Sequence, residues 1–135
     1  MVYNPHDGWI YCSLHVQGKI IRFSKDGTQV EDFAGSTQGY ADGVKESAKF
    51  NWPRGITIDK EGNLYVADEN NHRIRKVTTP DGIVTTYAGN GSAGWQDGIP
   101  TEAKFNHPWG IGVDNDGFIL VAERDNHRIR KIAIE

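Results

Sequence analysis

Two histidines stand in nearly the same surroundings, His72 in "NNHRIRKV" and His127 in "DNHRIRKI". Histidine can ligate a metal ion or act as a general base near neutral pH, so the repeated motif raises the question of a catalytic centre. The ligands of one metal ion must converge within a few ångströms, whereas equivalent positions of successive repeats are separated by a whole structural unit. The sequence therefore predicts a structural motif, with no metal and no cofactor. Its members are Asn71, His72, Arg73, Asn126, His127 and Arg128.

The basic residues of "RIRK" at 73–76 and 128–131 suggest a second chemistry, the binding of nucleic acid. Their alternation with isoleucine is typical of a β-strand with one wetter face, and long arginine stems can cover apolar surface. The chain carries a net charge of −3, and acidic residues flank both segments: Asp68, Glu69, Glu123 and Asp125. We therefore expect no nucleic-acid partner.

Other motifs for catalysis or metal binding are weak. "DKEG" at 59–62 and "DNDG" at 114–117 supply too few oxygens for calcium and match the turn of a β-hairpin. No G-x-S-x-G motif and no glycine-rich phosphate motif occurs in the sequence. Cys12 or Ser13 beside His15 has no third orienting group, and a single cysteine excludes an internal disulfide. No catalytic residue is predicted.

The elements that position these residues come in repeats. Shifting the sequence by 55 positions aligns "FNWPRGITIDKEGNLYVADENNHRIRKV" from Phe50 with "FNHPWGIGVDNDGFILVAERDNHRIRKI" from Phe105 without a gap. A weaker copy precedes them, in which "DGWIYCSLHVQGKIIRF" parallels "EGNLYVADENNHRIRKV". A period of about 50 residues is the signature of a solenoid, an array or a propeller.

Each repeat contains four short β-strands joined by turns. The strands "GITID", "NLYVAD", "HRIRKVT" and "IVTTYAG" are separated by "KEG", "ENN" and "TPDG", which is the pattern of a four-stranded antiparallel propeller blade. The sequence predicts an all-β fold, a partial β-propeller with blades at about 1–35, 53–89 and 108–135. The last blade is expected to lack its outer strand, which leaves roughly two and three-quarter blades.

The segment "NLYVADENNHRIRKV" and its partner ending in "DNHRIRKI" resemble the NHL repeat. The segment "YAGNGSAGWQDGIPTEAKFNHPWGI" is similar to the long inter-blade connection of bacterial members. The first copy departs from the motif, because Gln17, Gly18 and Lys19 replace Asn, His and Arg. The resemblance implies a ring of about six blades, a bacterial source and an extracytoplasmic location. It also implies that further blades, or a second copy of the chain, supply the outer strand of the last blade.

The inter-blade connections at 35–51 and 89–107 are the expected binding surface. Because strands alternate in direction, these connections emerge on the same side of the ring as the links at 69–71 and 124–126. Long loops on a rigid sheet scaffold often carry binding. The expected binding residues are Trp95, Tyr40, Trp109, Arg54 and Glu123.

Such a surface predicts a non-enzymatic binding or scaffold module that presents a loop-lined face to a protein or glycan partner. The alternative is part of a propeller lyase or hydrolase whose catalytic metal ligands lie in blades absent from this chain. No apolar run approaches the length of about 18 residues that a membrane span requires, so no span is expected.

Overall fold

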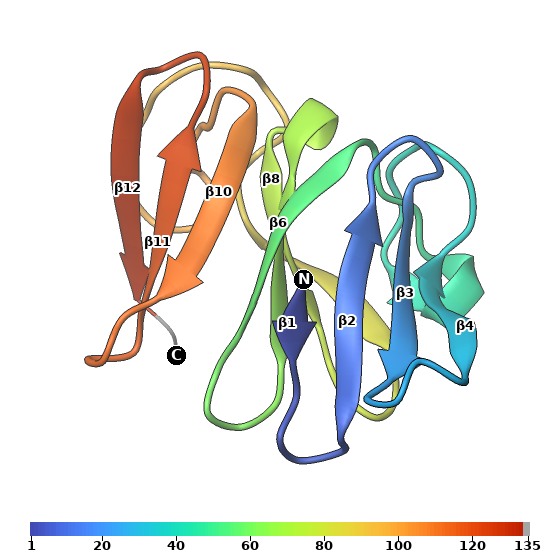
Figure 1. The fold of residues 1–135 in the computed structure, drawn as a ribbon. Coiled ribbons are helices and arrows are strands. Elements are labelled where there is room, and N and C mark those ends of the chain that lie inside the picture. The colour runs from blue at the N-terminus through green and yellow to red at the C-terminus, as the bar shows by residue number, and fades with distance from the viewer. Residues whose placement is uncertain (134–135) are drawn as a thin grey trace.

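The structure, a computed structural model, describes residues 1–133 and contains three antiparallel β-sheets that stand side by side (Figure 1). The first sheet has the order β1-β2-β3-β4. Its strands are β1 (Val2–Tyr3), β2 (Trp9–Leu14), β3 (Lys19–Ser24) and β4 (Val30–Gly35). Each strand runs back beside the one before it, which is the meander expected of a blade.

The second sheet has one strand more than the sequence predicted, in the order β5-β9-β8-β7-β6. The extra strand, β5, is short and belongs to the connection from the first sheet, and its Gly43 and Val44 pair with Val84 and Ile83. The strands are β5 (Gly43–Val44), β6 (Pro53–Ile58), β7 (Leu64–Asp68), β8 (Arg73–Val77) and β9 (Ile83–Ala88). Two 3₁₀ turns accompany them, η1 (Lys45–Ser47) and η2 (Glu69–Asn71).

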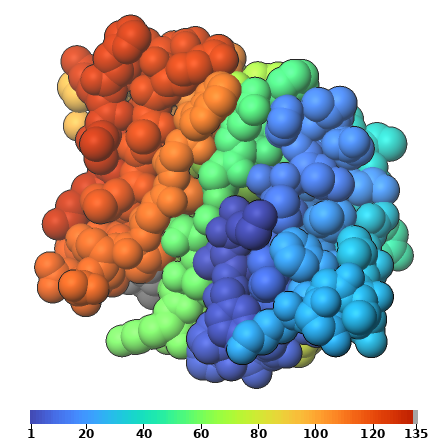
Figure 2. All heavy atoms as spheres, viewed as in Figure 1, coloured from blue at the N-terminus to red at the C-terminus, as the bar shows by residue number. Residues whose placement is uncertain are grey.

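The third sheet consists, within residues 1–133, of β10 (Pro108–Val113), β11 (Phe118–Glu123) and β12 (Arg128–Ala133) in sequence order. Figure 2 shows the sheets as adjoining blocks of colour, with the red side chains of β12 at one outer margin. The fold class predicted from the sequence, an all-β partial propeller, is confirmed. Among the described residues no helix is long and apolar enough to span a membrane.

Aspartates close the turn between β6 and β7 in the second sheet and the turn between β10 and β11 in the third. Asp59 Oδ1 accepts hydrogen bonds from the backbone N–H groups of Glu61 (2.9 Å) and Asn63 (3.0 Å). Asp114 Oδ1 accepts equivalent bonds from Asp116 and Phe118, both at 2.9 Å. Each aspartate oxygen thus accepts backbone N–H groups of its own turn. This is the expected arrangement for the turn of a β-hairpin.

Two apolar layers hold the three sheets together, and β7 contributes to both. All five residues of β7 are buried. Successive side chains of a strand point to opposite faces, so Leu64 and Val66 pack toward the first sheet while Tyr65 and Ala67 pack toward the third. The central sheet is therefore covered on both faces, which fixes the ends of its strands relative to those of its neighbours.

Candidate functional site

The second arginine of each "RIRK" segment is a buried structural residue. Arg75 is fully buried, and its Nη1 donates to Asp68 Oδ2 (2.9 Å) and to the carbonyl of Lys49 (2.8 Å). Its Nη2 donates to the carbonyl of Ala41 (2.7 Å) and to Asp42 Oδ1 (2.8 Å). One guanidinium thus ties the preceding connection to β8.

Arg130 repeats this arrangement in the third sheet. Its Nη1 donates to Glu123 Oε1 (2.6 Å) and the carbonyl of Lys104 (2.8 Å), and its Nη2 donates to the carbonyl of Gln96 (2.9 Å) and to Asp97 Oδ1 (2.8 Å). Because arginine presents several donors in one planar fork, a single side chain can satisfy this many carbonyl and carboxylate oxygens.

An asparagine and an acidic residue complete each set. Asn71 Nδ2 donates to Asp68 Oδ2 (2.7 Å) and to the carbonyl of Gly39 (2.8 Å). Asn126 Nδ2 donates to Glu123 Oε2 and to the carbonyl of Gly94. We call each set a connection clamp: Asp68, Asn71 and Arg75 in the second sheet, and Glu123, Asn126 and Arg130 in the third.

Burial sets the electrostatics of the first clamp. Burial raises the pKa of the Asp68 carboxyl to about 6, and the positive charge of Arg75 opposes that rise. A buried ion pair costs desolvation energy that good geometry and further hydrogen bonds must offset. The backbone N–H of Asn51 supplies such a bond to Asp68 Oδ1 at 2.8 Å.

His72 lies in the left-handed region (φ 51°) at the end of η2 and has a structural hydrogen bond of its own. Its Nδ1 accepts the backbone N–H of His107 (3.1 Å), and the two rings meet edge to face with centroids 4.6 Å apart. Burial, and after it the neighbouring His107, lowers the pKa of His72. A neutral ring is the form that can accept this hydrogen bond.

The first copy of the repeat reaches the same result with a different residue. The residue equivalent to His107 there is Trp52, and its backbone N–H donates to Gln38 Oε1 (3.0 Å). Gln38 Nε2 also donates to the carbonyls of His15 and Val16. Gly18 replaces the histidine, and a Cβ at Gly18 would lie 3.1 Å from Gln38 Oε1. The missing histidine of the first copy is therefore compensated by a glutamine from the connection.

The upper face is the end of the sheets at the top of Figure 1, where β2, β7 and β11 end. It carries a row of rings and guanidinium groups, which we call the upper-face row: His15, Trp52, Arg54, Trp109 and Arg124. The Arg54 Cζ atom lies 5.1 Å from the ring centroid of Trp52 and 4.0 Å from that of Trp109. The His15 ring is 5.2 Å from Trp52, and Arg124 Cζ is 5.3 Å from Trp109.

A β-bulge in each inner strand brings Arg54 and Trp109 together. The pairing of β6 with β7 shifts between Pro53 and Ile56, and that of β10 with β11 shifts between Pro108 and Gly110. Bulges re-aim the side chains they carry. The strands also approach closely, since a Cβ on Gly55 would lie 2.7 Å from the carbonyl oxygen of Trp109.

Two carboxylates orient the guanidinium groups of the row. Glu69 is only 2% exposed, and its oxygens lie 3.4 Å from Arg54 Nε and 3.5 Å from Arg124 Nη1. Arg124 also contacts Asp125 at 3.0 Å, which lowers the pKa of that carboxyl. These two arginines and two carboxylates balance in charge, so the arrangement suits a neutral polar ligand better than a polyanion.

A hollow of about 380 Å³ opens beside the row. Ser13, whose hydroxyl donates to the carbonyl of Arg54, lies on one side, and Trp109, 38% exposed, lies on the other. The lining residues are Ser13, His15, Pro53, Arg54, Gly55, Trp109 and Gly110. An indole ring with a few oriented polar groups at a concave surface is the composition of a small-ligand site.

The structure separates the five residues proposed for binding. Arg54 and Trp109 meet on the upper face, whereas Tyr40 packs on Arg73 (3.8 Å) and Trp95 packs on Arg128 (4.1 Å), each where a connection meets its own sheet. Glu123 is 4% exposed and belongs to the second connection clamp. It therefore has a structural role in place of the surface role that the sequence suggested.

Sequence reasoning missed Arg75, Arg130 and Glu69. For the arginines a signal was present, since an acidic residue, an asparagine three positions later and an arginine seven positions later occur at 68, 71 and 75 and again at 123, 126 and 130. Glu69 carried no such signal, because Arg124 stands at its equivalent position in the next repeat.

Comparisons with known proteins agree with this fold. The family model described as "NHL repeat" matches residues 50–77 and 105–132. NHL repeat-containing protein 2 of Gallus gallus is 36% identical over 116 residues, which cover 85% of this chain and 16% of that protein. The Homo sapiens protein of the same name is 40% identical over 72% of this chain and 14% of its own length.

Solved structures match nearly the whole chain. A structural genomics protein from Bacteroides thetaiotaomicron is 36% identical with a TM-score of 0.91, over 98% of this chain and 34% of that one. An auxiliary nutrient binding protein from the same organism is 32% identical with a TM-score of 0.85, over 96% and 35%. Virginiamycin B lyase from Staphylococcus aureus, 18% identical with a TM-score of 0.60 over 98% and 40%, shares the fold. The chain thus spans little more than a third of each matched structure.

Proposed function

This chain belongs to the NHL-repeat β-propeller family, and on that footing we propose that it is a non-enzymatic binding module whose upper face holds a neutral carbohydrate. The observation that carries the proposal is the stack of Trp109 on Arg54 beside the hollow. The apolar face of a sugar ring packs on an indole, and the oriented guanidinium and carboxylate groups supply donors and acceptors for its hydroxyls.

The similarity to a nutrient binding protein at 32% identity supports a soluble small ligand. A bacterial source and an extracytoplasmic location accord with such a ligand and rest on the family resemblance. A protein partner on the same face is the competing assignment. A lyase or hydrolase activity has weaker support, because the similarity to a lyase at 18% identity is one of fold alone.

The test is to titrate the chain with maltohexaose, cellohexaose and xylohexaose and to monitor binding by tryptophan fluorescence and calorimetry. We expect one of these sugars to bind and Trp109→Ala to weaken that binding at least about tenfold, the loss of one stacking contact worth about 1.4 kcal/mol. The matched control is Trp95→Ala, an exposed ring that belongs neither to the upper-face row nor to the lining of the hollow, and this change should leave binding unchanged. A folded chain that binds none of the sugars, or binds equally in both variants, overturns the proposal.

A further inference from the structure

The connection between β9 and β10 contains the dipeptide Asn90–Gly91. Asn90 is the one asparagine of the 135-residue sequence that precedes a glycine. The backbone nitrogen of the residue after an asparagine can attack the Cγ atom of the asparagine side chain and close a succinimide ring. Glycine hinders this attack least, because it has no side chain beside the nitrogen.

The structure requires glycine at position 91. Gly91 has a φ of 89°, in the left-handed region. A Cβ at this position would lie 2.5 Å from Arg73 Nη2, 2.6 Å from its Cζ and 2.8 Å from its Nη1, so the guanidinium group lies directly against Gly91. No other residue can stand here without displacing Arg73. The reactive dipeptide is therefore part of this contact.

The side chain of Asn90 is folded over the peptide group that follows it. Asn90 Oδ1 accepts the backbone N–H of Ser92 at 2.9 Å, which is the hydrogen bond of an Asx turn. This bond draws electron density from Cγ and stabilises the negative charge that Oδ1 acquires when Cγ is attacked. Asn90 is exposed, so ammonia formed from Nδ2 can leave into water.

The nucleophile is the Gly91 nitrogen after loss of its proton. The negative charge of this deprotonated amide is shared with the carbonyl oxygen of Asn90, because both atoms belong to one peptide group. Arg73 Nη2 donates to that oxygen at 3.2 Å, so a guanidinium is bonded to the atom where the charge develops. Within residues 1–133 the Gly91 N–H makes no hydrogen bond that the reaction would have to break.

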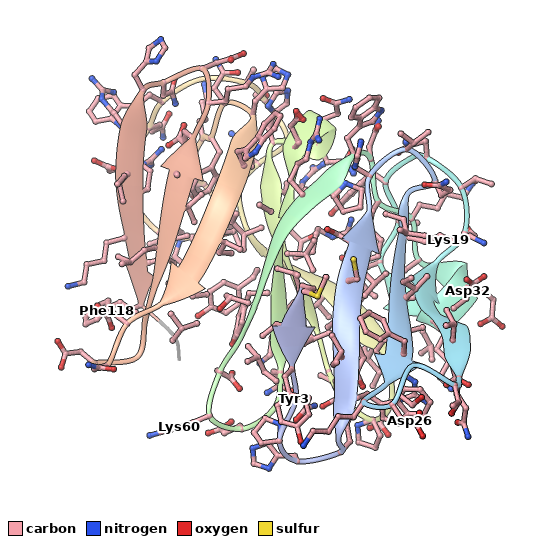
Figure 3. All side chains as sticks on the ribbon, viewed as in Figure 1. Tyr3, Lys19, Asp26, Asp32, Lys60 and Phe118 are labelled. Carbon is pink, nitrogen blue, oxygen red and sulfur yellow. The ribbon has the colours of Figure 1, made fainter. Side chains whose placement is uncertain are left out.

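The charge of Arg73 is available for this role. Lys19, its equivalent in the first sheet, pairs with Asp32 at 2.9 Å, and Figure 3 shows the two on neighbouring strands. The residue of β9 equivalent to Asp32 is the uncharged Thr86. Arg73 instead stacks on the ring of Tyr40 at 3.8 Å. The guanidinium is thus held beside the dipeptide without a carboxylate at the position that neutralises Lys19.

From these contacts we infer that the chain modifies itself at Asn90, with Arg73 and the Ser92 N–H accelerating the reaction. Hydroxide takes the Gly91 amide proton, and the nitrogen bonds to Cγ of Asn90. The Cγ–Nδ2 bond then breaks, and ammonia leaves with a proton from water, which regenerates hydroxide. Water opens the succinimide at either of its carbonyl groups and leaves aspartate or isoaspartate at position 90.

The product changes the contact between the connection and β8. Either product places a carboxylate next to the guanidinium of Arg73, and isoaspartate also adds a methylene group to the backbone of the connection. The new charge pairs with a side chain that had only neutral partners, Tyr40 and the Asn90 carbonyl. This modification does not depend on the carbohydrate proposal, which concerns the upper-face row.

The first test compares the folded chain with the blocked peptide AGNGSAG, the sequence of residues 88–94, in the same mildly alkaline buffer. Peptide mapping by mass spectrometry gives the fraction converted at position 90, and Asn90→Asp supplies the reference for the aspartate product. We expect conversion at least about threefold faster in the folded chain than in the peptide, because the fold supplies both charge-stabilising donors. The exposed Asn115, which precedes Asp116, is the internal control and should change little. A rate in the folded chain equal to or below that of the peptide overturns the inference.

The second test separates the charge of Arg73 from a role as a mere restraint. Arg73→Met should slow conversion at least about fivefold, because the deprotonated amide loses its positive partner, whereas Arg73→Lys keeps a charge and should retain most of the rate. A mere restraint would have the opposite effect, since its removal loosens Asn90 and speeds the reaction. The matched control is Arg128→Met, the equivalent position in the third sheet, where the guanidinium packs on Trp95.

Arg128→Met should leave the rate at Asn90 unchanged, and circular dichroism checks that each variant is folded. An unchanged or faster rate in folded Arg73→Met, or an equal slowing in Arg128→Met, overturns the inference. If the methionine variant does not fold, the comparison of the wild-type chain with the peptide still decides the matter.

Discussion

At the scale of single residues, two arginines that are neighbours in the motif have different roles. Arg73 packs on the exposed ring of Tyr40, while Arg75 is buried among four oxygen acceptors. Sequence alone assigned both to a strand with one wetter face. The two side chains are two residues apart and point to the same face of β8, where both contact Tyr40. They differ because Arg73 stands at the start of the strand, whereas Arg75 lies further along it and binds the carbonyls of Ala41 and Lys49 in the connection that covers this face.

Replacing Arg75 by methionine is expected to lower the free energy of unfolding by about 3–5 kcal/mol, because Asp68 is then left buried without its positive partner. Urea denaturation measures the loss. The matched control is Arg73→Met, which removes a contact worth about 0.5–1 kcal/mol with Tyr40. Equal losses of unfolding free energy in the two variants would show that the buried arginine contributes no more to stability than Arg73 does.

His72→Ala is expected to cost about 1 kcal/mol at pH 7.5, because the backbone N–H of His107 loses its acceptor. His127→Ala controls for the left-handed backbone at an equivalent position, where φ is 52°. A tight zinc site lost in both variants would contradict the structural assignment of the motif.

The contribution of His72 should also depend on pH. Its pKa is lowered in the folded state, so below the unfolded value of about 6.5 the unfolded chain binds the proton more readily. The stability that His72 provides is complete above that pH and decreases as the pH falls below it. The difference in unfolding free energy between wild type and His72→Ala should therefore shrink between pH 7.5 and 5.5, and a constant difference would refute this.

At the scale of elements, the close approach of β6 and β10 positions the upper-face row. Gly55 permits it, because a side chain there would meet the carbonyl oxygen of Trp109 at 2.7 Å and the amide nitrogen of Ile111 at 3.0 Å. Both are backbone atoms and cannot rotate away. The equivalent Gly110 is different, since its added Cβ would meet only the Ala122 side chain at 3.5 Å.

Gly55→Ala is accordingly expected to cost about 1–3 kcal/mol by overpacking, and to separate Arg54 from Trp109. Gly110→Ala should cost less than half as much. Thermal unfolding gives the stabilities, and the tryptophan emission spectrum reports on the surroundings of Trp109. Similar melting temperatures for the two variants would contradict the close approach.

The repeats made most of this element structure predictable. A gapless shift of 55 residues placed the strands, the turns and the equivalence of Arg54 with Trp109. It could not show that β5 pairs with β9, because that pairing joins segments about forty positions apart with no repeated partner. Nor could it show that Tyr40 packs on Arg73 whereas Trp109 packs on Arg54, because the repeat alignment does not include the connection that contains Tyr40.

At the scale of the whole molecule, the two outer sheets are covered less completely than the central one. Ile129 of the third sheet and Val30 of the first are 75% and 67% exposed, while their equivalents in the second sheet, Ile74 and Val84, are buried. Exposed apolar side chains beside an unpaired strand edge favour association between chains.

The 135-residue chain should therefore associate at micromolar concentration, with a mass by light scattering that rises with concentration. Ile129→Lys should reduce this association, because it places a charge on the exposed strand. Val44→Lys, at a position 52% exposed on the short strand β5, is the control and should have little effect. A strictly monomeric, folded species at every concentration would contradict the expectation.

The connection clamps have a consequence for how such a protein can grow or shrink in evolution. Each arginine binds the connection that precedes its own sheet: Arg75 holds Ala41 and Lys49, and Arg130 holds Gln96 and Lys104. A segment that contains one whole connection, the sheet that follows it and both halves of a clamp thus begins after Gly35 and ends at Gly89. A gene duplication or deletion with these limits would add or remove one sheet and leave every clamp paired. A cut placed between a connection and its following sheet would instead separate an arginine from its oxygens.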